Sequence, residues 1–379
     1  MITKPKLLIF IEYFLPGFKS GGPVQSVKNL IIILQPYYSI FVVTRDRDFL
    51  DTQPYDGIAP DTWLCKDGYQ IMYCSPAKLT MRSIYRLVQE PSFDFIYANS
   101  LFGQFSIKLL SMAWITGKRF IIAPRGELHK GALRLKYYKK YPFLQLIKRV
   151  FKSQIKWHAT DENELKAIRS FFPKSQIGLV PVVLAPDTPE QLTQRTVALK
   201  QKGKARFIFV SRITPKKGLD FLANVLKLQT AEGIELDIYG PIDDLNYWQI
   251  CQKEFSLVAD SCTVRYKGVA EHSQISRVLA DYDYFILPTR GENFGHAIFE
   301  AFSVGLPVLI SDQTQWRNLE QQQAGWDIPL TDRHWLDTIK KAMEIDTETY
   351  SVMSQAARTV ADTYMNSESF AEKYRLLFS

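Results

Sequence analysis

Two glutamates bound the segment Glu292-Asn-Phe-Gly-His-Ala-Ile-Phe-Glu300, which follows an apolar run and opens a helical pattern. Carboxylates accept hydrogen bonds and donate none, so they suit the hydroxyl groups of a sugar or a ribose. At this spacing the two glutamates cannot contact one atom, but they can hold two parts of one extended ligand. The free amide groups at the start of the helix favour a phosphate. Taken alone, the segment could equally be an acidic helix start with solvated glutamates.

A basic loop, Ser211-Arg212-Ile-Thr-Pro-Lys216-Lys217-Gly218, follows another apolar run. The Arg212 guanidinium can hold phosphate oxygens through two parallel hydrogen bonds, and Lys217 adds a compact positive charge. Gly218 begins a helix, whose N-terminus then also faces the loop. This combination suits a diphosphate, and the alternative is a solvated basic turn.

A glycine-rich turn, Gly17-Phe-Lys-Ser-Gly21-Gly22-Pro23, follows the first apolar run of the chain. It is similar to turns that cradle phosphates, but it matches neither the G-x-G-x-x-G pattern nor a P-loop. By itself this turn is better explained as structural.

Short apolar runs alternate with helical patterns through both halves of the chain, and these elements must position the three loops. The runs expected to form strands are 7–11, 40–44, 93–98, 119–123 and 155–160, then 207–210, 235–239, 263–266, 284–288 and 308–311. Helices are expected over 105–114, 219–228 and 296–304, and two further helices are expected to begin at residues 24 and 161. Such alternation predicts an α/β protein with parallel sheets. Because ligands bind at the carboxyl ends of parallel strands, the loops after strands matter most.

A chain of 379 residues suits two domains of roughly 100–200 residues each. The polar segment after residue 185 carries Pro186 and Pro189, so we expect domains at 1–185 and 205–366, a linker at 186–204, and a terminal segment at 367–379. No apolar run approaches the roughly 20 residues of a membrane span. Glu12 interrupts the first run, which favours a strand over a signal peptide. The four cysteines lack metal-ligand spacing and are expected to be reduced, buried thiols of a cytoplasmic protein.

In this order and spacing, the three loops resemble those of the family-4 retaining glycosyltransferases (glycosyl transferases group 1). Glu292 and Glu300 match the E-x7-E signature of that family, and Arg212 with Lys217-Gly218 matches its R-x4-K-G element. Gly21-Gly22 matches its N-terminal glycine loop, and Gly305-Leu-Pro307-Val matches its G-x-P-V turn. The stretch from Ala123 to Leu133, with His158-Ala-Thr160, resembles a bacterial branch that builds surface polysaccharides.

The resemblance implies a GT-B fold, in which two Rossmann-like domains with parallel sheets face a central cleft and segment 367–379 packs back on the first domain. It implies that Glu300 binds the donor ribose, that Glu292 contacts the donor sugar, and that Arg212 and Lys217 neutralise the diphosphate, so that Arg212, Lys217 and Glu292 are the catalytic residues. The other donor-binding positions that it implies are Gly21, Gly22, Gly268, Val269, Asn293, Phe294 and Gly295. Family members retain the anomeric configuration by same-face attack, without a metal, a cofactor or a dedicated base.

One departure concerns the acceptor side. Many family members carry a histidine in the loop after a middle strand of the first domain, whereas this chain reads Ala98-Asn99-Ser100-Leu-Phe-Gly103. The acceptor-side candidates are therefore Asn99, Ser100, Arg125, Glu127 and His129, and His129 could equally be a plain surface residue. Two D-x-D sequences, Asp46-Arg-Asp48 and Asp281-Tyr-Asp283, have the form of a metal site of another fold, but we expect capping roles and no metal.

The net charge of the chain is +8, and residues 130–156 hold nine lysines and arginines without an acidic residue. Aromatic and aliphatic side chains are interleaved with these cations, which is typical of a surface that binds an anionic membrane. The alternative is a solvated helix face, and no nucleic-acid motif accompanies the charge. Since acceptors in this family are often lipid-linked, we expect a nucleotide-sugar donor, a lipid-linked saccharide acceptor and a peripheral location on the inner face of the membrane. The competing functions are a GT-B epimerase of sugar nucleotides and a non-catalytic scaffold.

Overall fold

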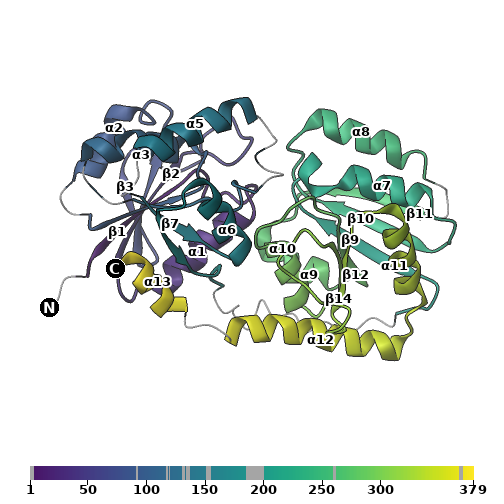
Figure 1. Cartoon of the computed structure of the whole chain (residues 1–379). Coiled ribbons are helices and arrows are strands. Elements are labelled where there is room, and N and C mark those ends of the chain that lie inside the picture. The colour runs from purple at the N-terminus through teal and green to yellow at the C-terminus, as the bar shows by residue number, and fades with distance from the viewer. Residues whose placement is uncertain are drawn as a thin grey trace. The chain divides into compact units, whose positions relative to one another are not determined.

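The computed structural model describes residues 4–90, 93–116, 118, 120–129, 133, 137–150, 155–184, 200–258, 262–366 and 370–379. The chain divides into two compact units, one of Met1–Ala185 with Ser369–Ser379 and one of Pro186–Glu368 (Figure 1). Residues 186–199 of the predicted linker lie outside the described residues.

The first unit is built on one eight-stranded sheet, in the order β3-β4-β2-β1-β5-β6-β7-β8. Its strands are β1 (Lys6–Ile11), β2 (Ser39–Arg45), β3 (Trp63–Lys66), β4 (Tyr69–Cys74), β5 (Phe95–Asn99), β6 (Phe120–Ala123), β7 (Ile155–Ala159) and β8 (Gln176–Leu179). Neighbouring strands are parallel except β3 and β4, which form an antiparallel hairpin. From β1 the chain builds outward through β2, and from β5 it builds outward the other way, so the strand order reverses between β1 and β5.

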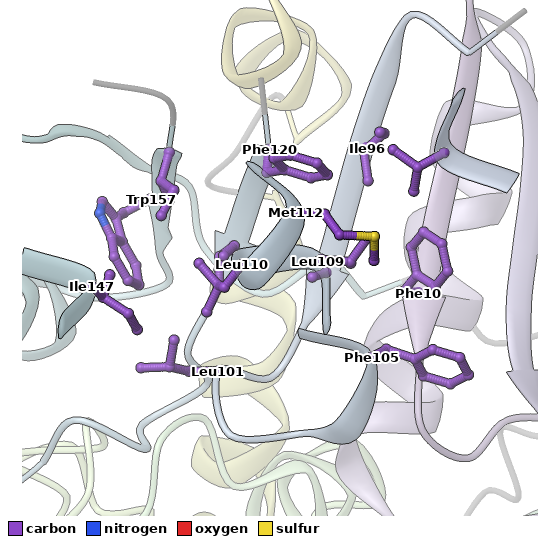
Figure 2. Close-up of a cluster of buried hydrophobic side chains, with 14 of the residues drawn as sticks. Phe10, Ile96, Leu101, Phe105, Leu109, Leu110, Met112, Phe120, Ile147 and Trp157 are labelled. Carbon is purple, nitrogen blue, oxygen red and sulfur yellow. The ribbon is translucent and has the colours of Figure 1, made fainter. Parts of the chain in front are cut away.

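Six helices of the first unit have described bounds: α1 (Gly22–Leu34), α2 (Met81–Gln89), α3 (Gln104–Thr116), α5 (Tyr137–Val150), α6 (Glu162–Phe171) and α13 (Phe370–Phe378). Figure 2 shows the core between α3 and the sheet, where Leu109 and Met112 lie among side chains of the strands. The ring of Phe105 lies 5.5 Å from that of Phe10 on β1. The terminal helix α13 belongs to this unit, because the Phe378 ring packs against those of Tyr38 and Tyr97 at 5.6 and 5.9 Å.

The second unit is built on a six-stranded sheet in the order β11-β10-β9-β12-β13-β14, with every neighbouring pair of described strands parallel. Its strands are β9 (Ala205–Val210), β10 (Ile234–Tyr239), β11 (Cys262–Gly268), β12 (Tyr284–Leu287), β13 (Val308–Ser311) and β14 (Gly325–Ile328). Its helices are η1 (Pro215–Lys217), α7 (Leu219–Lys227), α8 (Leu245–Phe255), α9 (His272–Leu279), α10 (His296–Ser303), α11 (Asp332–Glu344) and α12 (Thr347–Asn366). Every residue of β12 and β13 is buried, as expected for parallel strands covered on both faces.

The α/β class and the two parallel sheets predicted from the sequence are confirmed. Two details differ. β5 begins two residues later than predicted, because the Asp94 carboxylate accepts the Lys6 N–H at 2.7 Å just before the strand. The β3–β4 hairpin was not predicted, although Asp67-Gly68, both with positive φ, form its two-residue turn.

The four cysteines are free thiols. Cys74 and Cys251 are buried as predicted, whereas Cys262 is half-buried and Cys65 is exposed on β3, so the prediction of burial is wrong for Cys65.

Candidate functional site

The basic loop follows β9 and the E-x7-E segment follows β12, and these two strands are neighbours in the second sheet. The strand order reverses between them, since β9 leads outward to β10 and β12 leads outward to β13. Such a switch point is the usual ligand site of an open parallel sheet. The sheet topology therefore brings together two loops that lie about 75 residues apart in the chain.

Lys217 and Glu292 form an ion pair across this switch point, with only 13% and 15% of their side chains exposed. Burial raises the pKa of Glu292, but Lys217 and then Lys216 outweigh it, so the pKa of this carboxyl is held below its ordinary value. Glu292 is therefore ionised at neutral pH. A buried, paired ammonium and carboxylate at a strand end can contact the phosphate and hydroxyl groups of one ligand.

Gly218 shows why glycine is needed where the two loops meet. Its φ is 74°, and a Cβ at this position would lie 2.0 Å from the carbonyl oxygen of Pro288. The backbone after β9 thus passes directly against the backbone after β12. Any side chain at Gly218 would separate the two loops.

The helices α7 and α10 both start at this edge of the sheet, behind the left-handed glycines Gly218 and Gly295. In the described residues, neither N-cap glycine makes a side-chain hydrogen bond to its helix, but the Tyr247 hydroxyl accepts the Asp220 N–H in the first turn of α7 at 3.0 Å. Uncapped amide groups and the positive end of the helix dipole favour an anion.

Arg212 lies at the end of β9, where its Nη1 donates to Asp243 Oδ2 at 3.1 Å. Glu300 is half-buried one turn into α10, and Asn293 lies in the loop before that helix. The carbonyl of buried Phe294 accepts a 2.7 Å hydrogen bond from Trp316 Nε1. At the end of β11 the Gly268 carbonyl accepts from the Gly240 N–H at 2.8 Å, and Val269 is 42% exposed.

Sequence reasoning missed three residues that tie this site together, which are Asp220, Tyr247 and Arg290. The Arg290 guanidinium donates to both carboxylate oxygens of Asp220, at 2.9 and 2.7 Å. The Tyr247 hydroxyl donates to Asp220 Oδ1 at 2.6 Å. The available signal was an arginine two positions before Glu292 and an aspartate three after Lys217, but nothing local indicates that they pair.

The glycine loop of the first unit follows β1, at the switch point between β1 and β5. Gly21 caps α1 with a φ of 71°, and the first turn of this helix has no acidic residue. The carboxylate of Asp48 fixes the loop, because its Oδ2 accepts the N–H groups of Phe18 and Lys19 at 2.9 and 3.1 Å.

The acceptor-side candidates gather at the ends of β5 and β6. Glu127 accepts from the Ser100 hydroxyl at 2.9 Å and from the N–H groups of Leu101 and Phe102 at 2.5 and 3.1 Å. Burial raises the pKa of Glu127 despite these hydrogen bonds, which act to lower it. The carboxylate therefore holds the loop after β5 in place.

Arg125 joins the same edge of the sheet. Its Nε donates to Asn99 Oδ1 at 2.7 Å, and its Nη2 donates to the Tyr97 hydroxyl at 2.9 Å. The Nε2 atom of half-buried His129 is inaccessible to solvent and has no hydrogen-bond partner among the described residues. The structure thus brings Asn99, Ser100, Arg125 and Glu127 into one edge, where most of their polar atoms bind the protein itself.

The D-x-D sequences have structural partners, although not the caps that were predicted. Asp283 pairs with Arg206 at the start of β9, where Arg206 Nη2 lies 2.9 Å from its Oδ1. Asp46 pairs with Arg47 at 2.8 Å, and Asp48 holds the glycine loop. Within the described ranges, no three acidic, histidine or cysteine side chains lie close enough to hold a metal ion.

Part of the predicted basic stretch forms α5. Leu144 and Ile147 are buried, whereas Tyr138, Tyr141 and Leu146 are 70%, 41% and 56% exposed. Residues 130–132, 134–136 and 151–154 of the stretch lie outside the described residues. Among the helices with described residues, none is both long and apolar enough to cross a membrane.

Residues 190–360 match the model of the family described as glycosyl transferases group 1. The chain is similar to an uncharacterized 41.2 kDa protein in the cps region of Klebsiella pneumoniae, with 24% identity over 60% of this chain and 63% of that protein. The chain thus spans less than two thirds of the length of that relative.

Solved structures of other proteins resemble nearly the whole chain. Sucrose-phosphate synthase from Thermosynechococcus elongatus superposes with a TM-score of 0.74, at 16% identity over 99% of both chains. Anabaena HepE, solved in complex with UDP and glucose, superposes with a TM-score of 0.68, at 15% identity over 98% of both chains. At these identities the likeness shows the fold, which is the GT-B fold predicted from the sequence.

Proposed function

We propose that the protein is a retaining glycosyltransferase that uses a nucleoside-diphosphate sugar, because residues 190–360 match the glycosyl transferases group 1 model and the chain has a GT-B fold. The observation that carries this proposal is the buried Lys217–Glu292 pair at the switch point of the second sheet, beside the starts of α7 and α10, which follow left-handed glycines. These groups offer one cation, one carboxylate and the positive ends of two helix dipoles to a single ligand.

The charges of the site fit a diphosphate leaving group. Lys217, Arg212 and the helix starts stabilise negative charge as the bond to the sugar breaks. Glu292 is ionised beside Lys217 and Lys216, so its carboxylate accepts hydrogen bonds from sugar hydroxyls. Glu300 binds the ribose, and the backbone of Gly268 and Val269 contacts the base. The departing phosphate takes the proton of the acceptor, so this mechanism uses no metal, cofactor or separate base.

The acceptor proposal is a growing, lipid-linked oligosaccharide of a surface polysaccharide. The similar Klebsiella protein is described as lying in a cps region, which supports a role in polysaccharide synthesis. The exposed Tyr138, Tyr141 and Leu146 of α5, beside Lys139 and Lys148, suit a peripheral site on an anionic membrane surface.

Donor use is tested by incubating the protein with a panel of UDP-, GDP- and ADP-sugars and measuring nucleoside diphosphate release with and without a saccharide acceptor. Thermal stabilisation by each nucleoside diphosphate identifies the base. Glu300→Gln should weaken binding at least tenfold, because a ribose contact with a charged acceptor is worth about 1.5–3 kcal/mol. The exposed Glu344 is the matched control, and Glu344→Gln should leave binding unchanged. No stabilisation by any nucleotide would contradict the proposal, and conversion of the sugar nucleotide without an acceptor would favour the epimerase.

Membrane attachment is tested by flotation with vesicles of neutral or 30% anionic lipid at physiological salt. Leu146→Glu should abolish binding to the anionic vesicles, because it replaces an exposed apolar side chain of α5 by a carboxylate. The control is Leu245→Glu on α8 of the second unit, whose leucine is 68% exposed. Equal flotation of both variants would place the contact elsewhere.

A further inference from the structure

A second ion pair joins the same two loops as Lys217 and Glu292. The guanidinium of Arg290 faces the carboxylate of Asp220 with two parallel hydrogen bonds of 2.9 and 2.7 Å. Arg290 stands two positions before Glu292, and Asp220 stands three positions after Lys217. The two ion pairs therefore connect the same two loops, which follow β9 and β12.

The backbone of Arg290 is tied to the basic loop as well. Its N–H donates to the Lys216 carbonyl at 2.7 Å, and that carbonyl also accepts from the Thr289 hydroxyl at 3.2 Å. The Arg290 Nη1 atom donates to the Pro215 carbonyl too. Arg290 thus holds η1, the turn that carries Lys217, from its side chain and its backbone together.

Asp220 is also hydrogen-bonded to Tyr247 of α8. The Tyr247 hydroxyl donates to its carboxylate at 2.6 Å and accepts the Asp220 N–H at 3.0 Å. Asp244 caps α8 through the Tyr247 N–H at 3.0 Å, and the adjacent Asp243 pairs with Arg212. The short segment 243–247 therefore holds Arg212 of the basic loop and also Asp220, the partner of Arg290.

Exposure indicates what this second pair does. The side chains of Arg290 and Asp220 are 43% and 29% exposed, and an ion pair this open to solvent adds little to stability. The planar guanidinium of Arg290, with its two parallel hydrogen bonds, instead fixes the distance and angle between Arg290 and Asp220, which a lysine cannot do. Neither side chain has a place in the donor contacts proposed above.

We propose that Arg290 is a positioning residue, which locks the loops after β9 and β12 together through Asp220 and so sets Lys217 against Glu292 for the donor diphosphate. This inference rests on the proposed function. Because a misplacement of about 1 Å can cost 100-fold in rate, Arg290→Gln should lower transfer by about that factor. Arg290→Lys should recover little of it, since the fork is lost although the charge stays.

The chain offers a matched control at the opposite end of the same strands. Arg206 forks onto Asp283 with hydrogen bonds of 2.9 and 3.3 Å, and its side chain is 39% exposed. Because Asp283 is only 6% exposed, Arg206→Gln should lower stability. It should leave nucleotide affinity unchanged, which is the reverse of the result expected for Arg290→Gln.

The test combines two measurements on the full-length variants. Hydrogen exchange of the ligand-free protein should accelerate at 215–219 and 289–295 in Arg290→Gln, without a change in melting temperature. Affinity for the nucleoside diphosphate that binds best should fall about tenfold, and the same substitution should have no further effect in a Lys217→Met background.

Unchanged exchange in these segments, or an equal loss of affinity in the Lys217→Met background, would overturn the proposal. Faster exchange with unchanged affinity would also overturn it, because the tie would then be purely structural. If the unaltered protein binds no nucleotide, the proposed function fails, whereas the exchange result separately decides whether Arg290 holds the two loops.

Discussion

Replacing Lys217 by alanine removes the main partner of a buried carboxylate. Glu292 would keep its burial, with 15% of its side chain exposed, and Lys216 and the Asn293 N–H would remain to oppose the desolvation of the charge. Breaking a buried pair from one side costs about 3–5 kcal/mol. We expect about 3 kcal/mol at pH 7.5, at the lower end, because the site is partly open and Lys216 remains.

The pH dependence gives the sign of this effect. In the unaltered protein the pKa of Glu292 lies below its ordinary value of 4.5, so its contribution to stability is present at neutral pH and is lost as the pH falls through that lowered value. In Lys217→Ala, burial is no longer outweighed and the pKa should rise above 4.5. The loss in stability should then be largest at pH 7.5 and should shrink toward pH 5, as the carboxyl gains a proton.

The measurement is amide hydrogen exchange of β9 and β12, which reports the opening free energy of the second unit alone. A loss of about 3 kcal/mol corresponds to roughly 100-fold faster exchange of the most protected amides. Lys227→Ala is the matched control, since Lys227 pairs with Glu254 in the same unit at 25% and 26% exposure. That more open pair should cost under about 1 kcal/mol. Equal effects of the two substitutions, or a Lys217→Ala effect independent of pH, would refute the reasoning.

Three further predictions concern the framework. Gly218→Ala should lower the free energy of unfolding by more than about 2 kcal/mol and abolish nucleotide binding, because its Cβ would lie 2.0 Å from the Pro288 oxygen. Thermal melting and nucleotide titration measure these effects, and normal nucleotide binding would contradict the prediction. Glu127→Ala should leave three donors of the loop after β5 without their acceptor and cost about 2–3 kcal/mol, whereas Glu127→Gln should cost less, as urea unfolding would show. Phe378→Ala should lower the stability of the first unit by about 3–4 kcal/mol, because this ring is 1% exposed and anchors α13. Hydrogen-exchange protection of β5 should therefore fall, while that of β12 in the second unit should stay the same.

The sequence was most informative where the local pattern and the fold agree. The buried strand β12 and the loop with Glu292 were predicted within one residue, because a short apolar run followed by glycines is a strand and its loop. The R-x4-K-G and E-x7-E segments were also placed at strand ends, where the structure has them.

Side-chain pairing was the part that the sequence could not predict. The approach of Lys217 to Glu292 and of Arg290 to Asp220 depends on β9 and β12 being neighbours, which is a property of strand order. The family resemblance singled out Asn99, Ser100, Arg125 and Glu127 as acceptor-side candidates, but not as partners of one another. No local periodicity encodes a contact over a separation of 70 residues.

The two loops of the site follow β9 and β12, which are neighbours in the sheet but lie far apart in the chain, so a single break could place them on separate fragments. A break in the loop between β11 and α9 would leave Arg212 and Lys217 on one fragment and Glu292 and Glu300 on the other. Neither fragment alone would keep its loop in the conformation seen here, because each loop is shaped by backbone contacts with the other. Joined to two interacting proteins, such fragments would recover nucleotide binding only on reassembly, which would make this unit a split reporter of proximity.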